Sequence, residues 1–241
     1  AILLTPHSLV GPFIPVYTGA AEIYLAPSTE DELADIAAEY RRLYLVLGDA
    51  QAGEVQALAQ EWLDRNGFRA THEWSDSLQV LAYGTAEGTP PLSPTSAVNA
   101  SLGDEIVLTG YALSSGAGLP PSSSWQAGGI IPLTLFWTRG QVAPEHDYNV
   151  FVHLLDENGQ PVTQADSAPV GGSRPTSGWD EDEQIVDRHG LLLPQSLPAG
   201  AYMLHVGMYF LETGERLPVM GSSEQSPADS VALQEIKIAT P

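Results

Sequence analysis

The feature that most constrains this chain is a series of short apolar runs that begins near Asp104 and continues almost to the C-terminus. Turn-forming Gly, Pro, Asn and Asp residues separate these runs, and no helical period interrupts them. Such a pattern is typical of an antiparallel β-sandwich, Ig-like or jelly-roll-like. We expect about eight strands, at residues 106–113, 130–138, 148–156, 161–165, 183–193, 201–211, 216–219 and 230–238.

Two stretches add detail to this sandwich. Asn158-Gly159 separates two apolar runs, and Asn-Gly is a strong signal for a β-hairpin. Residues 202–211 are largely apolar at both alternating sets of positions, so we expect this strand to be central in its sheet.

Residues 1–84 have a different pattern, in which apolar runs alternate with helical periodicities. Thr29 and Glu32 form a capping box before one amphipathic helix, and a second helix follows and ends at Asn66-Gly67 in a left-handed turn. The continuous apolar run at 43–47 is expected to be the central strand, and 69–74 and 78–83 to close the sheet. A proline-interrupted connection with a short helix is expected over 6–19.

The stretch between these regions is rich in Pro, Ser, Thr and Gly and has neither period. The sequence therefore predicts an α+β chain of two domains. A small three-layer α/β domain spans 1–84, a linker spans 85–102, and the β-sandwich spans 103–241.

Composition excludes several classes of function. The net charge of −21 opposes binding to nucleic acid or anionic lipid, which would repel such a protein. With no cysteine, the chain has no disulfide, thiolate metal site or cysteine nucleophile. No apolar run approaches the length of about 18–20 residues that spans a bilayer. The sequence begins without methionine at what resembles a buried strand, which suggests a piece of a longer protein.

The glycine-containing stretch 48–53 follows a strand, as a phosphate-binding loop would. Glu54 and Val55 stand where such a loop needs lysine and serine or threonine, so an ordinary strand-to-helix turn is favoured. The sequence also contains no G-x-S-x-G elbow and no G-x-G-x-x-G after a strand. We therefore expect no nucleotide or other cofactor and no serine-hydrolase chemistry.

Three groups of side chains could still hold a cation. Asp180 and Asp182 form an Asp-x-Asp in an acidic loop, which in some nucleotide-sugar transferases holds a divalent ion, although a solvated loop explains them as well. Asp156, Asn158 and Asp166 could bracket Ca²⁺, although turn chemistry explains the first two. His153 and His205 lie within apolar strands and could face one another around a transition metal, but single strand histidines usually have structural roles.

Aromatic residues suggest a platform for sugar rings. The set comprises Trp125, Trp137, Trp179, Tyr148, Tyr202 and Tyr209. Core filling is the alternative role for all six. Trp125 and Trp179 are in loops and are expected to be the exposed members, so the candidate ligand-binding residues are Trp125, Trp179, Asp180 and Asp182.

The motifs DYNVFVHLLDENG, PTSGW, LPAGAY and TGERLP occur in order between Asp147 and Pro218. With them, roughly residues 130–220 resemble the C-terminal extracytoplasmic β-sandwich of bacterial polytopic proteins related to family 39 glycosyltransferases, the protein-mannosyltransferase-like group. Residues 1–84 resemble, more loosely, the small α/β unit that follows the last membrane helix of such proteins.

The resemblance implies an accessory role rather than catalysis. In that family the catalytic acidic residue lies in an early loop between membrane helices and the donor is a polyprenyl-phosphate sugar, so no catalytic residue carries over to this chain. The implied location is outside the cytoplasmic membrane, tethered to it through the membrane-embedded remainder of the same polypeptide. The implied roles are positioning an acceptor, binding glycan or stabilising the parent enzyme. An independent carbohydrate-binding module at the cell surface is the alternative, and a metal-dependent enzyme at the acidic loop is a third hypothesis.

Overall fold

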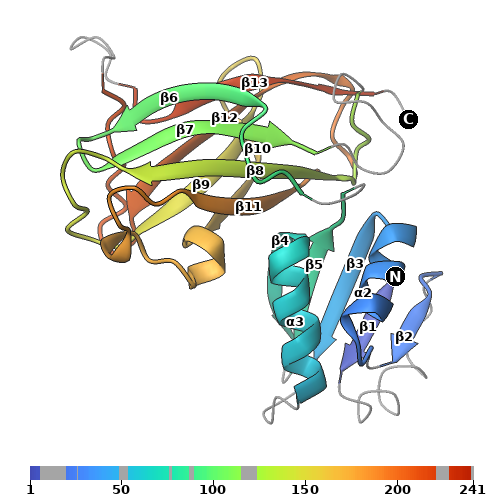
Figure 1. The fold of residues 1–241 in the computed structure, drawn as a ribbon. Helices are drawn as coiled ribbons and strands as arrows, with labels where there is room; N and C mark the ends of the chain where they lie inside the picture. The colour runs from blue at the N-terminus through green and yellow to red at the C-terminus, as the bar shows by residue number, and fades with distance from the viewer. Residues whose placement is uncertain are drawn as a thin grey trace. The chain divides into compact units, whose positions relative to one another are not determined.

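The computed structural model describes residues 1–5, 20–25, 27–48, 54–75, 78–86, 90–114, 124–220 and 228–239. These residues form two compact units, one up to Pro90 and the other from Pro91 onwards. The predicted connection at 6–19 and most of the glycine-containing stretch 48–53 lie outside the described residues. Figure 1 labels the elements of both units, which are described separately below.

The first unit contains a mixed five-stranded sheet in the order β2-β1-β3-β5-β4. Strands β1, β2 and β3 are parallel, whereas β5 runs antiparallel to both β3 and β4. The strands are β1 (Ile2–Thr5), β2 (Ile23–Leu25), β3 (Arg42–Leu47), β4 (Phe68–Ser75) and β5 (Leu78–Gly84). The apolar run at 43–47 is the central strand, as predicted.

Two helices, α2 (Glu30–Glu39) and α3 (Glu54–Asn66), cover one face of this sheet. Leu33 and Ile36 of α2 and Trp62 and Leu63 of α3 belong to one buried cluster with inward residues of β1, β3 and β5. The cluster arises because the apolar residues recur at helical spacing, which gives each helix a single apolar stripe. Both described helices lie on that face, and the third layer expected from the sequence is not among the described residues.

The predicted cap at the N-terminus of α2 is confirmed, whereas the predicted turn at the C-terminus of α3 is wrong. The Thr29 hydroxyl accepts a hydrogen bond from the Glu32 amide at 3.2 Å, which confirms the N-cap. The Glu32 carboxylate accepts from the Ser28 amide at 3.0 Å, one residue earlier than a strict capping box. The predicted left-handed turn at Gly67 is wrong, because Gly67 does not have a positive φ. Its hydrogen atom is needed instead for close packing, since a Cβ would lie 2.9 Å from the Leu63 carbonyl oxygen.

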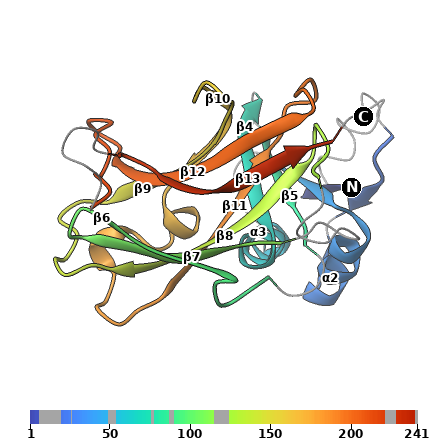
Figure 2. The same cartoon turned by 90° about the horizontal axis from the view of Figure 1, so that it is seen from above.

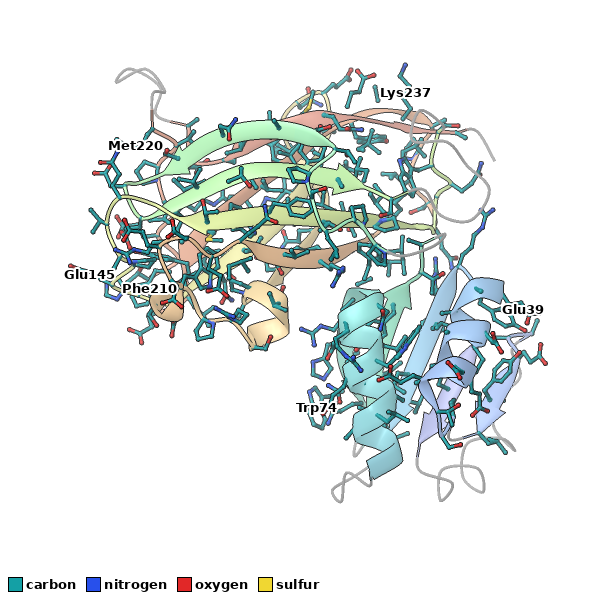
Figure 3. All side chains as sticks on the ribbon, in the orientation of Figure 1. Glu39, Trp74, Glu145, Phe210, Met220 and Lys237 are labelled. Carbon is teal, nitrogen blue, oxygen red and sulfur yellow. The ribbon has the colours of Figure 1, made fainter. Side chains whose placement is uncertain are left out.

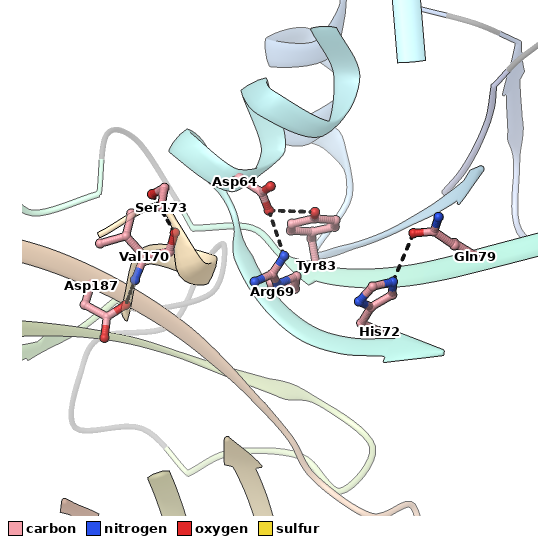
Figure 4. A network of polar contacts seen from close by, with 8 residues as sticks. All are labelled: Asp64, Arg69, His72, Gln79, Tyr83, Val170, Ser173 and Asp187. Carbon is pink, nitrogen blue, oxygen red and sulfur yellow. Dashed lines mark hydrogen bonds and ion pairs between the residues drawn. The ribbon is translucent and has the colours of Figure 1, made fainter. Parts of the chain in front are cut away.

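A polar network ties α3 to the sheet (Figure 4). The buried Tyr83 hydroxyl donates to Asp64 Oδ1 at 2.8 Å, and the Arg69 guanidinium lies 3.7 Å from the same oxygen. Burial, followed by the nearby Asp64 charge, raises the pKa of Tyr83. The hydroxyl therefore stays protonated and provides a permanent donor for the α3 carboxylate.

The second unit is the predicted antiparallel β-sandwich, with sheets ordered β10-β9-β12-β13 and β11-β8-β7-β6. Figure 2 shows β12 and β13 in one layer and β7 and β8 in the other. As predicted, β12 is central, between β9 and β13. The strands are β6 (Ser96–Leu102), β7 (Ile106–Leu113), β8 (Ile130–Arg139), β9 (Tyr148–Leu155), β10 (Pro161–Ser167), β11 (Ile185–Leu192), β12 (Gly200–Phe210) and β13 (Val231–Ile238).

Successive side chains of each strand point to opposite faces of its sheet, and the inward-pointing ones form the core between the two sheets. Val150, Val152 and Leu154 of β9 face Leu133 and Leu135 of β8 within one buried cluster. The intervening residues of β9 and β12 lie on the outer face of their sheet. That outer face carries the candidate site described below.

Part of the predicted linker is a strand. Residues 96–102 form β6, which pairs antiparallel with β7 across a bulge between Ala97 and Ala100. The strand pattern was hidden because small and polar residues dominate this edge strand, and only Leu102 is fully buried. Ordered sandwich structure therefore begins inside the stretch 85–102.

The predicted strand at 216–219 is reduced to isolated bridges, Arg216 to Tyr209 and Val219 to Leu102. It protects the β6 edge, because the Met220 amide donates to the Ser101 carbonyl at 2.8 Å. Covered edges prevent a sheet from pairing with other chains.

The hairpin at Asn158-Gly159 forms as predicted. Asp156 Oδ1 accepts hydrogen bonds from the Asn158 amide at 2.9 Å and from the Gln160 amide at 2.8 Å. The hydrogen bond from the Gln160 backbone holds the pKa of the Asp156 carboxyl below its usual range. Turn formation thus occupies this carboxylate.

Candidate functional site

The acidic loop belongs to a long connection between β10 and β11 that is held together by its own hydrogen bonds. This connection contains two short 3-10 turns, η2 (Pro169–Gly172) and η3 (Thr176–Gly178). Buried Thr176 accepts from the Tyr148 amide at 2.9 Å and donates to the His146 carbonyl at 2.7 Å. These bonds fasten the connection to the start of β9.

The expectation that Trp179 is an exposed platform is wrong. Only 4% of Trp179 is exposed, and its ring joins the sandwich core. The indole Nε1 donates to the Arg174 carbonyl at 3.0 Å, which satisfies its one polar group. Trp179 therefore closes one end of the core instead of offering a face to a ligand.

The other three candidate residues do not gather around Trp179 as a site. Asp180 and Asp182 are exposed at the surface of the connection. Trp125 is half-buried against the core, and its backbone bridges to Ile238 beside β13. Among the described residues, no three acidic or histidine side chains come together closely enough to hold a metal ion.

A buried hydrogen-bonded pair supports the same connection from inside the sandwich. His189 Nε2 and Asp187 Oδ2 of β11 lie 2.6 Å apart, and both side chains are almost fully buried. Asp187 Oδ1 accepts from the Val170 amide at 2.8 Å, and Ser173 Oγ donates to the Val170 carbonyl (Figure 4). Val170 has φ 51°, a strained conformation for a β-branched residue. The carboxylate thus holds η2 in a conformation that the chain would not adopt alone.

A concave polar surface lies elsewhere among the described residues of this unit, on the outer face of β9, β10 and β12. A depression of about 290 Å³ is present there. Its lining comes from these three strands and from the turn that follows β12. The lining residues are Phe151, His153, Gln164, Asp166, Tyr209, Gly214 and Arg216.

Phe151 forms the floor of this depression. Directly opposite it in the register is Gly207, where a Cβ would lie 2.3 Å from the Phe151 ring. The missing side chain lets the ring lie flat against β12, so that only 1% of Phe151 is exposed. The Arg216 guanidinium covers the ring at 4.3 Å from its centroid, in a cation–π contact.

The rim carries hydrogen-bonding groups. Arg216 Nη1 lies 3.1 Å from Asp229 Oδ2, so its charge is partly balanced. On the β10 side, Gln164 and Asp166 pair in register with His153 and Phe151. The half-exposed Tyr209 ring lies 6.4 Å from the Phe151 ring, centroid to centroid. Because Arg216 covers the Phe151 ring, the partly exposed Tyr209 is the aromatic residue of the lining that can stack on a small polyhydroxylated ring.

Two histidines lie beside this floor. His153 and His205 are direct partners in the β9–β12 register, on the outer face. His153 Nε2 lies 3.7 Å from Asp166 Oδ1, and His205 Nδ1 lies 3.0 Å from Ser230 Oγ. Burial, and then the neighbouring His153, lower the pKa of His205. The two histidines are thus register neighbours on one face, but their imidazoles make their polar contacts toward opposite sides, His153 with Asp166 and His205 with Ser230. A metal bound between them stays untested.

Sequence reasoning missed this depression as a site, although Tyr209, Asp166 and His153 had each been considered for other reasons. The available signal was Phe151, a large aromatic residue placed by alternation on the outer face of β9.

Figure 3 shows a different surface, with Glu145, Phe210 and Met220 together at one end of the sandwich. In the first unit, Trp74 is 65% exposed.

No protein-family model and no curated protein matches this sequence. Among solved structures, the C-terminal domain of Wzt is similar over 62% of this chain and 83% of its own, with 14% identity and a TM-score of 0.35. A Niemann-Pick type C2 protein from Japanese carpenter ant covers 62% of this chain and 100% of its own, with 11% identity and a TM-score of 0.32.

A third solved structure, Bifidobacterium dentium β-glucuronidase complexed with coumarin-3-O-glucuronide, covers 79% of this chain and 25% of its own, with 10% identity and a TM-score of 0.27. Likenesses at these TM-scores carry no argument about function. Within the described part of the chain, the helices are too short or too polar to cross a bilayer.

Proposed function

We propose that the β-sandwich is a non-catalytic glycan-binding module and that its site is the depression over Phe151. The observation that carries this proposal is the partly exposed Tyr209 ring beside polar side chains in a depression of about 290 Å³. That volume is at the low end for small-molecule sites, which suits one or two sugar rings. Tyr209 offers a ring for stacking, while Gln164 and Asp166 offer partners for hydroxyl groups.

The charges around the depression favour a neutral sugar. Asp166 places a carboxylate in the lining, and Asp229 already pairs with Arg216. The chain as a whole carries a net charge of −21, which repels acidic ligands. We therefore expect neutral glycans to bind more tightly than uronic or sialic acids.

The resemblance to family 39-like glycosyltransferases supports a wider context for this module. In that context the chain is an extracytoplasmic accessory region of a membrane glycosyltransferase-like protein, where it positions an acceptor or glycan or stabilises the parent enzyme. Reading the source gene upstream of the codon for Ala1 tests this context. Several apolar spans of about 20 residues would support it, whereas a lone signal peptide would leave an independent surface module.

Binding itself can be tested with amide chemical shifts of the labelled 241-residue chain. The probes are methyl glycosides of mannose, glucose, galactose and N-acetylglucosamine, with methyl glucuronide as the acidic comparison. We expect shifts clustered on β9, β10 and β12, and about a tenfold loss of affinity in Tyr209→Ala or Asp166→Ala, because each removes one stacking or hydrogen-bonding contact worth about 1 kcal/mol or more.

Trp74→Ala is the matched control, because Trp74 is exposed and belongs to the first unit. It should leave the affinity unchanged. Absence of binding by every probe, or binding that is insensitive to both depression variants, would contradict the proposal.

A further inference from the structure

One end of the sandwich carries apolar side chains that the fold leaves exposed. Three segments form this end: the turn between β6 and β7 (103–105), the connection between β8 and β9 (140–147) and the segment after β12 (211–220). Val142 is 50% exposed, Leu211 63% and Met220 51%. Neighbouring exposed apolar residues mark sites of interaction, whereas single ones are ordinary on a protein surface.

Backbone hydrogen bonds join the three segments into one surface. The Gly103 amide donates to the Pro218 carbonyl at 2.8 Å, and the Val142 amide donates to the Asp104 carbonyl at 3.0 Å. The turn 103–105 therefore lies between the other two segments. We call the surface that they form the loop end of the sandwich, and Figure 3 labels Phe210 and Met220 there.

An aromatic stack orders part of the loop end. The His146 ring lies 4.4 Å from the Phe210 ring, centroid to centroid, with 22° between their planes, and Tyr148 meets Phe210 edge-on at 6.5 Å. The Gly214 amide donates to the Phe210 carbonyl at 2.8 Å, which closes a tight turn around Leu211. The exposed Leu211 side chain is thus presented from an ordered base, and an ordered surface loses less entropy when it binds.

The same segments are strongly acidic. Their acidic residues are Asp104, Glu105, Glu145, Asp147, Glu212 and Glu215, and their one arginine, Arg216, pairs with Asp229. The Tyr148 hydroxyl lies 3.1 and 3.0 Å from the two carboxylate oxygens of Glu105. Burial, then the hydrogen bond to Glu105 and the charges of Glu105, Glu145 and Glu215, raise the pKa of Tyr148 to about 12.

Three carboxylates of the loop end are therefore close enough to act on one hydroxyl. Within the described part of the chain, Glu105, Glu145 and Glu215 form no ion pair. Their negative charge is left for a partner to balance.

This charge decides what can cover the apolar side chains. A second copy of the chain would bring the same carboxylates to the interface, where like charges repel. An anionic membrane would be repelled in the same way. A basic segment gains from both features, because its cations are attracted to the carboxylates while its apolar side chains cover those of the loop end.

We propose that the loop end binds a basic amphipathic segment of a partner protein, with Val142, Leu211 and Met220 as its apolar contacts and Glu145 and Glu215 as its charged contacts. None of these five residues lines the depression over Phe151. The interaction is therefore separate from glycan binding.

The test is calorimetric titration of the 241-residue chain with short acetylated peptides. In the probe, lysine alternates with leucine. In two comparison peptides, glutamate replaces the lysines or serine replaces the leucines. We expect the lysine–leucine peptide to bind at least about tenfold more tightly than either comparison, and its affinity to fall about tenfold between roughly 50 and 300 mM NaCl.

The apolar contacts are tested by Leu211→Ser combined with Met220→Ser. This double variant should weaken binding of the lysine–leucine peptide about tenfold, because it removes apolar area from the interface. Leu25→Ser combined with Leu92→Ser is the matched control, since both leucines are exposed and lie outside the loop end. It should leave the affinity unchanged.

The charged contacts are tested by Glu145→Gln combined with Glu215→Gln, which should weaken binding about fivefold. Glu73→Gln combined with Glu157→Gln is the control, because it changes the net charge equally at exposed positions outside the loop end. Its affinity should stay close to that of the wild type.

Four results would overturn the proposal. They are no binding of the lysine–leucine peptide at low salt, equally tight binding of a comparison peptide, and equal losses of affinity in a test variant and its control. The fourth is self-association of the chain in sedimentation experiments that Leu211→Ser with Met220→Ser abolishes, because the loop end would then bind a second copy. None of these results bears on glycan binding in the depression.

Discussion

The Phe151 ring lies between the β12 backbone at Gly207 and the guanidinium of Arg216, on a sheet face that does not belong to the core. Its burial depends on one residue without a side chain and one with a long cationic side chain. The ring in turn fixes the position of Arg216 at the rim. A large apolar residue on an outer face is thus accommodated by two specific neighbours, and together they shape the depression.

Gly207→Ala tests this arrangement. The new Cβ would lie 2.3 Å from the Phe151 ring, and 3.1 Å from the Asp229 carbonyl, so the ring must leave its place. We expect a loss of about 1–3 kcal/mol in the free energy of unfolding, measured by denaturant titration.

The double variant Gly207→Ala with Phe151→Leu serves as its control. If the clash with the ring is the cause, the double variant should be more stable than the sum of the two single changes predicts. Simple additivity would contradict the proposed packing.

At the scale of elements, the connection between β10 and β11 is structural. Trp179 fills one end of the core. Thr176 hydrogen-bonds to the Tyr148 amide and the His146 carbonyl at the start of β9, and Asp187 accepts a hydrogen bond from the Val170 amide. Asp147 adds a bond to the Ser177 amide at 3.0 Å, and hydrogen bonds from Ser177 hold the pKa of this carboxyl below its usual range. The PTSGW motif is therefore explained by packing and hydrogen bonding without any ligand.

Trp179→Ala should accordingly destabilise the sandwich by about 3–5 kcal/mol, because it leaves a cavity and an unpaired Arg174 carbonyl. Thermal unfolding followed by circular dichroism measures this loss. Trp74→Ala is the matched tryptophan control and should change stability by less than about 0.5 kcal/mol, since its ring is exposed. A Trp179→Ala protein of undiminished stability would contradict the core role.

At the scale of the whole molecule, the acidic surface dominates. A net charge of −21 on 241 residues, with few cations to offset it, repels itself in the folded state more than in the expanded unfolded chain. The ion pairs Arg65–Glu30 and Lys237–Glu235 are exposed and contribute little. Electrostatics therefore act on the stability of this protein chiefly through repulsion.

Added salt should then stabilise the chain. We expect the Tm at pH 7.5 to rise by several degrees between roughly 10 mM and 500 mM NaCl, because the screening length falls from about 30 Å to a few ångströms. A melting temperature that falls with salt would mean that favourable ion pairs outweigh the repulsion. The comparison uses chloride, since sulfate also strengthens hydrophobic burial.

Local patterns in the sequence were sufficient to determine most elements of this protein. The strands β7, β8, β9 and β12, the cap at Thr29 and the hairpin at Asn158-Gly159 follow from alternation, helical spacing and turn chemistry, which involve residues near one another in the chain. β6 could not be predicted, because its small polar residues become a strand only through pairing with β7.

The candidate site was decided by tertiary structure alone. Phe151 is far in sequence from Gly207 and Arg216, as His153 is from His205, and they meet through the strand register, which no local pattern specifies. The same holds for Trp179. Its place in a polar loop suggests exposure, whereas the loop folds onto the core and buries the ring. Sequence alone therefore determined the elements, whereas the register and the packing between sheets determined which side chains form a surface for binding.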